Sequence, residues 1–308
     1  MNRRQFLLAT TAAAFVPQST QAAAPARRII DTHTHFYDPT RPQGVPWPDK
    51  GTKLYRKVMP SDWRAQALPH HIRATIVIEA SPWLEDNQWV LDLAANEQSI
   101  LGCVGNLDPT DAHFAKHLGR FAANPLFCGI RWRGELISQE KNQPAVLAAA
   151  RLLSSRGLSL DLNGPANTLP QAIKLAADVP DLRIVIDHLG SPGDPIALNP
   201  SWKNDIQKLA RHPHVFMKVS ALVEQMDCAE GQAPTDVAYY LPILDHLWQT
   251  FGPDRLIYGS NWPVSDKGAS YSTVFNIVDS YFTSKGAEAR ENYFWKNSLA
   301  AYRWKERE

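Results

Sequence analysis

Cysteine is scarce in this chain, since only Cys103, Cys128 and Cys228 occur among its 308 residues. An odd and sparse set excludes a disulfide framework even in an oxidising compartment. One pair, Cys103 with Cys128, is an alternative, but we expect three buried thiols. A strong charge of one sign is also missing, because 32 basic and 31 acidic residues leave a formal net charge of +1. This balance argues against a dedicated nucleic-acid surface.

Long apolar runs are missing after Val16, so we expect no stable membrane anchor in the rest of the chain. The start of the chain differs from the remainder. The pair Arg3-Arg4 precedes a short apolar stretch, and Thr20-Gln21-Ala22 offers a small-residue cleavage site. This order predicts an export signal over residues 1–22 that the twin-arginine translocation machinery recognises. We therefore expect residues 23–308 to form the mature protein, in the periplasm.

Short apolar runs alternate with helix-like segments along residues 23–308. We expect eight strands, near residues 28–30, 75–78, 101–104, 127–130, 158–160, 183–186, 215–217 and 256–258. We expect helices near residues 87–98, 112–122, 144–155, 169–177, 202–211, 237–250, 271–283 and 287–302. This rhythm predicts a single (β/α)₈ barrel domain. An open doubly wound sheet is the alternative, which is weakened because no glycine-rich nucleotide turn follows the first strand.

Polar side chains stand at the carboxyl end of every predicted strand, where barrel enzymes place their chemistry. The first strand is followed by His33 and His35, which share one face of an extended chain. The later strand ends supply Glu79, Asn106, Asp108, Arg131, Arg133, Asp161, Asn163, Asp187, His188, Lys218, Ser220, Ser260, Asn261 and Trp262. We therefore expect these groups to meet at one mouth of the barrel.

Five motifs in this order resemble the signatures of the amidohydrolase superfamily. They are Asp31-Thr32-His33-Thr34-His35, Gly129-Ile130-Arg131, Asp187-His188-Leu189-Gly190-Ser191-Pro192, Met217-Lys218-Val219-Ser220 and Tyr258-Gly259-Ser260-Asn261-Trp262-Pro263-Val264. More narrowly, the chain is similar to the amidohydrolase-related (amidohydrolase 2) branch of sugar-lactone and 2-pyrone-4,6-dicarboxylate lactonases. The resemblance implies the same barrel fold. It also implies hydrolysis of a lactone ester, with a small-molecule lactone or organic acid as substrate.

Two positions depart from the superfamily pattern. The fifth strand carries no metal-binding histidine, and Asn261 occupies the place of the strand-eight aspartate that activates water in the superfamily. An amide cannot accept a proton at neutral pH. The resemblance therefore leaves open either no metal or a single divalent ion, zinc, held by His33, His35 and His188.

The resemblance and the strand-end chemistry together predict lactone hydrolysis with little or no metal assistance. We expect the catalytic group to contain five residues: His33, His35, His188, Asn261 and Glu79. We expect four residues to contact substrate: Arg131, Lys218, Trp83 and Trp262. A histidine would polarise the carbonyl, and Arg131 would bind a carboxylate or hydroxyl groups.

Several roles stay open at this stage. The general base is His188, Glu79 or Asp31 acting through a histidine, while Glu79 could instead simply pair with Arg131. Lys218 could orient substrate or neutralise Glu79.

The aromatic residues also have alternative roles. Trp83 and Trp262 could stack on a sugar ring or on a lid. The long insert between the first two strands contains Trp47, Tyr55 and Trp63, and we interpret it as such a lid, with simple packing over the barrel end as the alternative.

Two other functions remain alternatives to a lactonase. One is a metal-dependent amidohydrolase or decarboxylase of the same superfamily. The other is a catalytically impaired relative that binds a small carbohydrate or acid, which Asn261 makes credible.

The export signal is testable through its paired arginines. The double substitution Arg3→Lys, Arg4→Lys should keep the uncut chain in the cytoplasmic fraction, because twin-arginine export depends on this pair. Immunoblots of cell fractions measure this, with Arg27→Lys as a control for the same chemical change outside the pair. Equal periplasmic yields from the double variant and the wild type would contradict the assignment.

Overall fold

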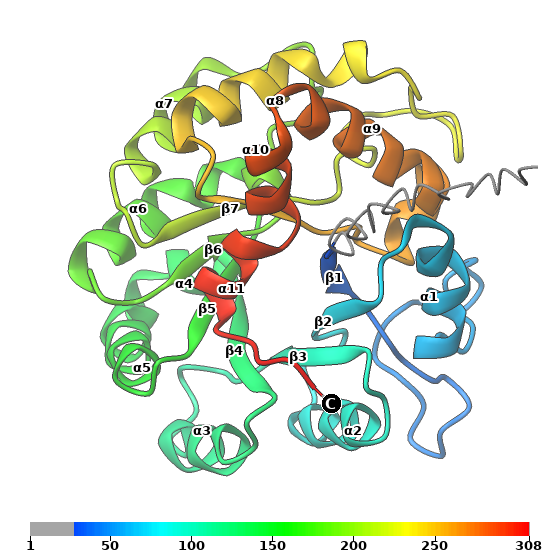
Figure 1. The fold of residues 1–308 in the computed structure, drawn as a ribbon. Coiled ribbons are helices and arrows are strands. Elements are labelled where there is room, and N and C mark those ends of the chain that lie inside the picture. Colours follow the sequence, from blue (N-terminus) through cyan, green and yellow to red (C-terminus); the bar gives the residue numbers. More distant parts are fainter. Residues whose placement is uncertain (1–27, 308) are drawn as a thin grey trace, which may run out of the picture.

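The computed structural model describes residues 28–307, and the predicted export signal at residues 1–22 lies outside them. Eight parallel strands follow one another in sequence order around a barrel (Figure 1). Their bounds are β1 Ile30–Thr34, β2 Ala74–Ile78, β3 Ile100–Gly105, β4 Phe127–Arg133, β5 Ser159–Asn163, β6 Ile184–Ile186, β7 Val215–Val219 and β8 Leu256–Tyr258. The backbone N–H of His35 donates to the Trp262 carbonyl at 3.0 Å, which joins the two ends of the sheet. The (β/α)₈ barrel prediction is confirmed.

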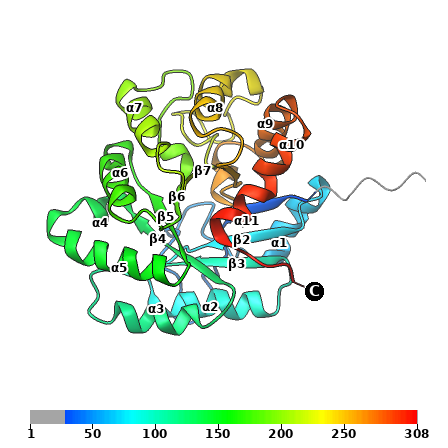
Figure 2. The same cartoon turned by 60° about the vertical axis from the view of Figure 1, so that its left-hand side comes forward.

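Helices surround the strands, as Figure 2 shows from a second side. They are α1 Pro60–Ala67, α2 Leu84–Ala95, α3 Phe114–Ala122, α4 Gly134–Ser138, α5 Gln143–Ser155, α6 Leu169–Asp178, α7 Pro200–Leu209, α8 Val237–Phe251, α9 Tyr271–Ser284, α10 Ala287–Glu291 and α11 Asn297–Tyr302. The sequence pattern predicted all of them except α1 and α4, which lie in connections without a clear apolar period. Within the described range, no helix combines the length and apolar character needed to cross a bilayer.

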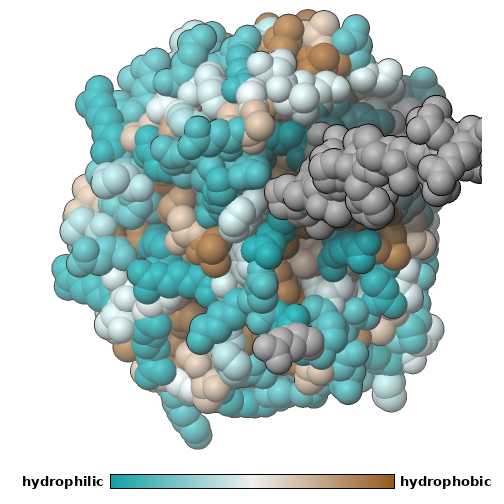
Figure 3. All heavy atoms as spheres, viewed as in Figure 1, coloured by the Kyte–Doolittle hydropathy of each residue, from teal (hydrophilic) through white to brown (hydrophobic). Residues whose placement is uncertain are grey.

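Alternate strand residues pack into two separate cores, as the two-residue period of a strand requires. Val77 belongs to the larger core, which the helices share, whereas Ile76 and Ile78 belong to a smaller one. The smaller core also contains Tyr302 and Trp304, so the C-terminal segment closes one end of the barrel beneath α11. The face seen in Figure 3 is mostly hydrophilic, with only separate apolar patches. Because the C-terminal segment closes one end of the barrel, the polar site lies at the other end, where the strands end.

The cysteines differ from expectation at one position. Cys103 and Cys128 are buried free thiols, but Cys228 is exposed in the connection that follows β7. Cys228 lies in a run of exposed residues, 227–232, which a count of three cysteines could not reveal.

The barrel interior leaves no room at Gly129 of β4. A Cβ added there would lie 2.7 Å from the Ser159 backbone oxygen on β5, so Gly129→Ala forces two paired strands apart. We expect a loss of about 2–3 kcal/mol in the free energy of unfolding. Gly119→Ala in α3 is the matched control, because its Cβ would meet nothing closer than the Arg156 side chain at 3.7 Å. The control should gain about 0.5–1 kcal/mol from helix propensity, and urea unfolding measures both. Equal stabilities would contradict this account of the interior.

Candidate active site

Three histidines meet at the carboxyl end of the barrel. The ring centroid of His33 in β1 lies 5.0 Å from that of His35 and 4.5 Å from that of His188, which follows β6. His33 is fully buried, and His35 is only 4% exposed. The structure therefore brings together the two motifs that the sequence placed far apart.

Strand β1 is irregular, and the irregularity gives its residues different neighbours. The pairing register with β2 shifts between Asp31 and Thr34. Asp31 accepts hydrogen bonds from Trp63 of α1 at 3.2 Å and Tyr271 of α9 at 3.0 Å, so its carboxylate faces the outer helices. His33, two residues later, instead faces Asp187 inside the barrel, with 3.6 Å between Nδ1 and Oδ1. Asp31 contacts the backbone N–H of His33 and not its ring, so the geometry does not support Asp31 as a base acting through that ring.

The histidine rings are neutral at neutral pH. Burial lowers the pKa of His35 to about 3, with Arg131 acting in the same direction. Burial also lowers the pKa of His188 to about 4, against the attraction of Asp187. His35 Nδ1 lies 3.0 Å from the Ile78 carbonyl, which can only accept, so Nδ1 carries the proton and Nε2 presents a lone pair. His188 Nδ1 lies 2.9 Å from the Ser220 hydroxyl.

The turn that carries His188 is strained. His188 has φ 54° and is followed by Leu189 at φ 59°. Such left-handed conformations are rare for residues other than glycine and cluster at functional sites. The contacts to Ser220 hold the strained turn against the end of β7.

A buried cation lies beneath the histidines. Lys218 Nζ lies 2.7 Å from Asp161 and 3.0 Å from Asp187, and none of the three side chains is exposed. Tyr302 donates a further hydrogen bond to Asp161 at 2.7 Å. Burial raises the pKa of Asp161, whereas Lys218 and His33 outweigh burial at Asp187 and hold its pKa well below the usual range. Lys218 thus neither reaches solvent nor contacts Glu79, which corrects its expected role at the substrate.

Arg131 and Glu79 pair with each other at the mouth. Arg131 Nε donates to Glu79 Oε1 at 2.9 Å, and Nη2 lies 2.8 Å from the same oxygen. The third guanidinium nitrogen, Nη1, lies 3.8 Å from Asp187 Oδ2. Glu79 is therefore paired with Arg131, which was the alternative to a catalytic role for Glu79. Arg131 itself is 8% exposed.

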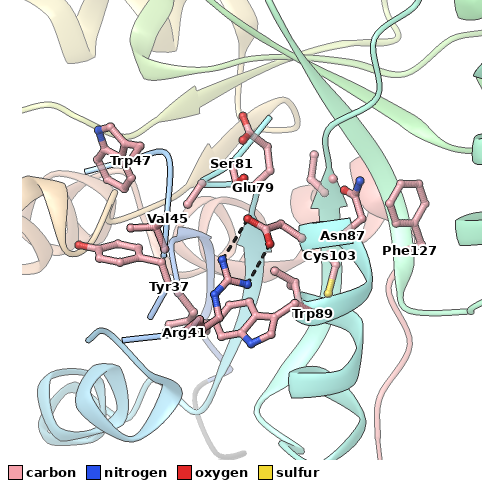
Figure 4. Close-up of a pocket in the computed structure, with 16 residues that line it drawn as sticks. Tyr37, Arg41, Val45, Trp47, Glu79, Ser81, Asn87, Trp89, Cys103 and Phe127 are labelled. Carbon is pink, nitrogen blue, oxygen red and sulfur yellow. Dashed lines mark hydrogen bonds and ion pairs between the residues drawn. The ribbon is translucent and has the colours of Figure 1, made fainter. Parts of the chain in front are cut away.

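The insert between β1 and β2 covers part of the mouth. Its Trp47 ring lies 5.8 Å from the ring of His35 and 5.3 Å from that of Tyr37. Arg41 fastens the insert to α2 through Asp86 at 2.8 Å and lies against the indole of Trp89 (Figure 4). The same insert lines a largely apolar pocket beside Glu79 and Ser81.

The other predicted aromatic contacts divide between packing and exposure. Trp63 is fully buried in α1, so it packs and does not form part of a lid surface. Trp262 is only 2% exposed and lies under Arg56 of the insert at 5.8 Å, so it contacts the lid and cannot stack on a sugar in this conformation. Trp83 precedes α2 and is 39% exposed.

The site offers ligand atoms for a divalent metal. One atom each of His33, Asp187 and His188 lies within 4.8 Å of the others. Both ring nitrogens of His33 and both oxygens of Asp187 lack a hydrogen bond of good geometry within the described residues. Two imidazoles and one carboxylate form a ligand set that suits zinc. His35 lies outside this group. The predicted ligand set of His33, His35 and His188 is therefore replaced by His33, Asp187 and His188.

One carboxylate of the site escaped the sequence analysis. Glu224 lies in the connection after β7, and its Oε1 accepts a hydrogen bond from Asn261 Nδ2 at 2.8 Å. Asn261 has φ 61° and is 4% exposed at the end of β8. Glu224 is four residues beyond Ser220, so no strand-end pattern could have indicated it.

Replacing the buried cation should destabilise the fold. Lys218→Met leaves the carboxylates of Asp161 and Asp187 uncompensated, so we expect a loss of about 3–5 kcal/mol in the free energy of unfolding. Lys174→Met is the control, because its ion pair with Asp178 is exposed on α6 and contributes about 0.5 kcal/mol or less. Urea unfolding at neutral pH measures both. A Lys218 variant as stable as the control would contradict the buried-pair interpretation.

Known proteins resemble this chain along nearly its whole length. A family model described as amidohydrolase matches residues 30–304. The chain is 28% identical over 283 residues to an L-fucono-1,5-lactonase of Burkholderia ambifaria, covering 89% of this chain and 95% of that protein. It is 26% identical to an L-fucono-1,5-lactonase of Burkholderia multivorans, covering 88% of this chain and 94% of that protein. A solved amidohydrolase structure from Burkholderia multivorans with bound zinc superposes with a TM-score of 0.81 at 24% identity, covering 90% of this chain and 99% of that one.

Proposed function

The chain belongs to the amidohydrolase family, and from this membership and the geometry of its site we propose that it hydrolyses the ring ester of a sugar-derived lactone. The observation that carries the proposal is the meeting of three neutral imidazoles with Arg131 at one barrel mouth. The similarity to two L-fucono-1,5-lactonases supports a sugar acid lactone in particular. A dicarboxylate lactone is the alternative substrate within the same reaction.

The side chains of the mouth suit this reaction in different ways. His33 and His188 each have a ring nitrogen without a protein hydrogen bond, so a ring N–H can donate to the lactone carbonyl as negative charge develops on it. His35 has its proton committed to Ile78, so its Nε2 accepts from a substrate hydroxyl or from water. Arg131 keeps a guanidinium edge beside this group and attracts the hydroxyls or the carboxylate of the substrate.

The metal-dependent alternative rests on the ligand atoms of His33, Asp187 and His188. An ion held by these three residues would polarise the carbonyl as a Lewis acid. The solved relative with bound zinc favours this alternative, whereas the ammonium of Lys218, 3.0 Å from Asp187, weakens the attraction of that carboxylate for a second cation. A catalytically impaired binding protein is the remaining alternative, which Asn261 favours. We further propose a periplasmic location, on the strength of residues 1–22 alone.

A panel of aldonolactones tests the function. The purified chain should release acid from at least one 1,4- or 1,5-lactone of a six-carbon sugar acid, measured with a pH indicator. His188→Ala should lower kcat/KM by about 10²-fold or more, because it removes a donor from the carbonyl site. His113→Ala is the control, since its side chain is 70% exposed and faces Asp111.

The same panel separates the alternatives. Loss of activity after dialysis against a chelator, with recovery on adding zinc, would support the metal-dependent function. Tight lactone binding without acid release would support the impaired relative. Unchanged activity in His188→Ala would contradict the assignment of the site.

A further inference from the structure

We propose that Glu224 is the general base of this site, positioned by Asn261. The proposal rests on the proposed lactone hydrolysis, because it names the group that activates water for that reaction. Four other carboxyl groups near the strand ends are less suited to this role, those of Asp31, Glu79, Asp161 and Asp187.

The two deepest carboxylates are already committed. Asp187 lies between Lys218 at 3.0 Å and His33 at 3.6 Å, and Asp161 lies between Lys218 and Tyr302, at 2.7 Å from each. Protonating either carboxylate would break its ion pair with the buried ammonium of Lys218. These groups therefore stabilise the interior and are poorly suited to take a proton from water.

The two carboxylates beside the first two strands are committed as well. Glu79 accepts two contacts from Arg131 at 2.8 and 2.9 Å. Asp31 accepts from Trp63, Tyr271 and the Ser260 backbone and faces away from the barrel interior. Both oxygens of Asp31 accept hydrogen bonds, and protonating Glu79 would break its ion pair with Arg131.

The histidines already have other contacts and roles. His35 donates its Nδ1 proton to the Ile78 carbonyl, and His188 Nδ1 lies 2.9 Å from the Ser220 hydroxyl. His33 and His188 serve as donors to the lactone carbonyl in the proposed reaction. The site therefore needs a further group with an unoccupied acceptor atom.

Glu224 has the contacts and the environment of such a base. Asn261 donates to Oε1 at 2.8 Å, while Oε2 is buried and has no hydrogen-bond partner within the described residues. Among residues 28–307, no cation pairs with this carboxyl at salt-bridge distance. Burial raises its pKa to about 7, and Lys267 and Tyr240 are charged or titratable groups that interact with it. Asn261 also contacts His35, so the carboxyl lies one side chain away from the histidine group.

The reaction balances with this single base. The Glu224 carboxylate takes a proton from water, and the water oxygen forms a bond to the lactone carbonyl carbon. The ring C–O bond of the tetrahedral intermediate then breaks, and the leaving alkoxide takes the proton from the Glu224 carboxyl. Lactone and water thus give a hydroxy acid, and Glu224 returns to its carboxylate form.

Glu224→Gln tests the proposal, because the amide keeps an acceptor for Asn261 and loses the base. On a lactone that the wild type hydrolyses, kcat should fall about 10²-fold or more, with KM within about threefold of the wild type. The wild-type kcat/KM should rise with pH and level off above about 7, since only the carboxylate form is active. The residual kcat/KM of Glu224→Gln should not show this rise with pH. A ¹³C carboxyl titration by NMR should show one glutamate signal near pH 7 that the variant lacks.

Glu230→Gln is the matched control, because it makes the same change in the same connection, where Glu230 pairs with Lys53 at the surface. Its kcat and pH profile should equal those of the wild type. Glu224→Asp keeps a carboxyl group and should retain more activity than Glu224→Gln, which separates loss of the base from loss of the fold. A wild type inactive on every lactone contradicts the proposed function and this proposal together. An active wild type with Glu224→Gln within threefold of its kcat, or with no glutamate titrating near pH 7, contradicts the role of Glu224 alone.

Discussion

The mouth of this barrel depends on one cation buried inside it. Lys218 lies fully buried between the carboxylates of Asp161 and Asp187, where an unpaired charge would cost several kcal/mol. Lys218 keeps Asp187 ionised, so a negative charge stays beside His33. Burial is the main cause that lowers the pKa of His33 and of His188, while Asp187 raises both pKa values and Lys218 lowers them. The ion group thus holds its carboxylates in place beside the histidines, and burial keeps the rings neutral.

This arrangement separates groups that hold the fold from groups that remain available for chemistry. Twelve buried side-chain atoms of the described residues lack a hydrogen-bond partner, and three of them belong to His33 and Glu224. Buried polar atoms are normally paired, so unpaired ones at the barrel mouth indicate a site that binds a ligand. They come from β1 and from the connection after β7, so only the closed barrel brings them together.

The sequence predicted the fold and most of the mouth because both depend on local order. Apolar runs identify strands, and polar residues directly after them identify strand ends, which is how His33, His188 and Arg131 were found. Ion pairs between side chains of different strands, by contrast, do not depend on local order. Lys218 could have faced substrate or Glu79, and only the register of β5, β6 and β7 shows that Asp161 and Asp187 enclose it. Likewise, the register shift in β1, which turns Asp31 outward, leaves no mark in the residue pattern.

Glu224 shows most clearly why the base escaped the sequence. A residue five positions past a strand end has no defined direction until its connection is folded, and this connection has no periodic pattern. Asn261, by contrast, is visible in the sequence as a departure from the family pattern, because an amide cannot serve as the base that the strand-eight aspartate provides. The structure relates the two residues. An amide at position 261 can donate to a neighbouring carboxylate, which an ionised aspartate there could not do. A second carboxylate at 2.8 Å would repel Glu224. Asn261 and a basic Glu224 are therefore compatible with each other, whereas an aspartate at 261 would compete with Glu224 for a single proton.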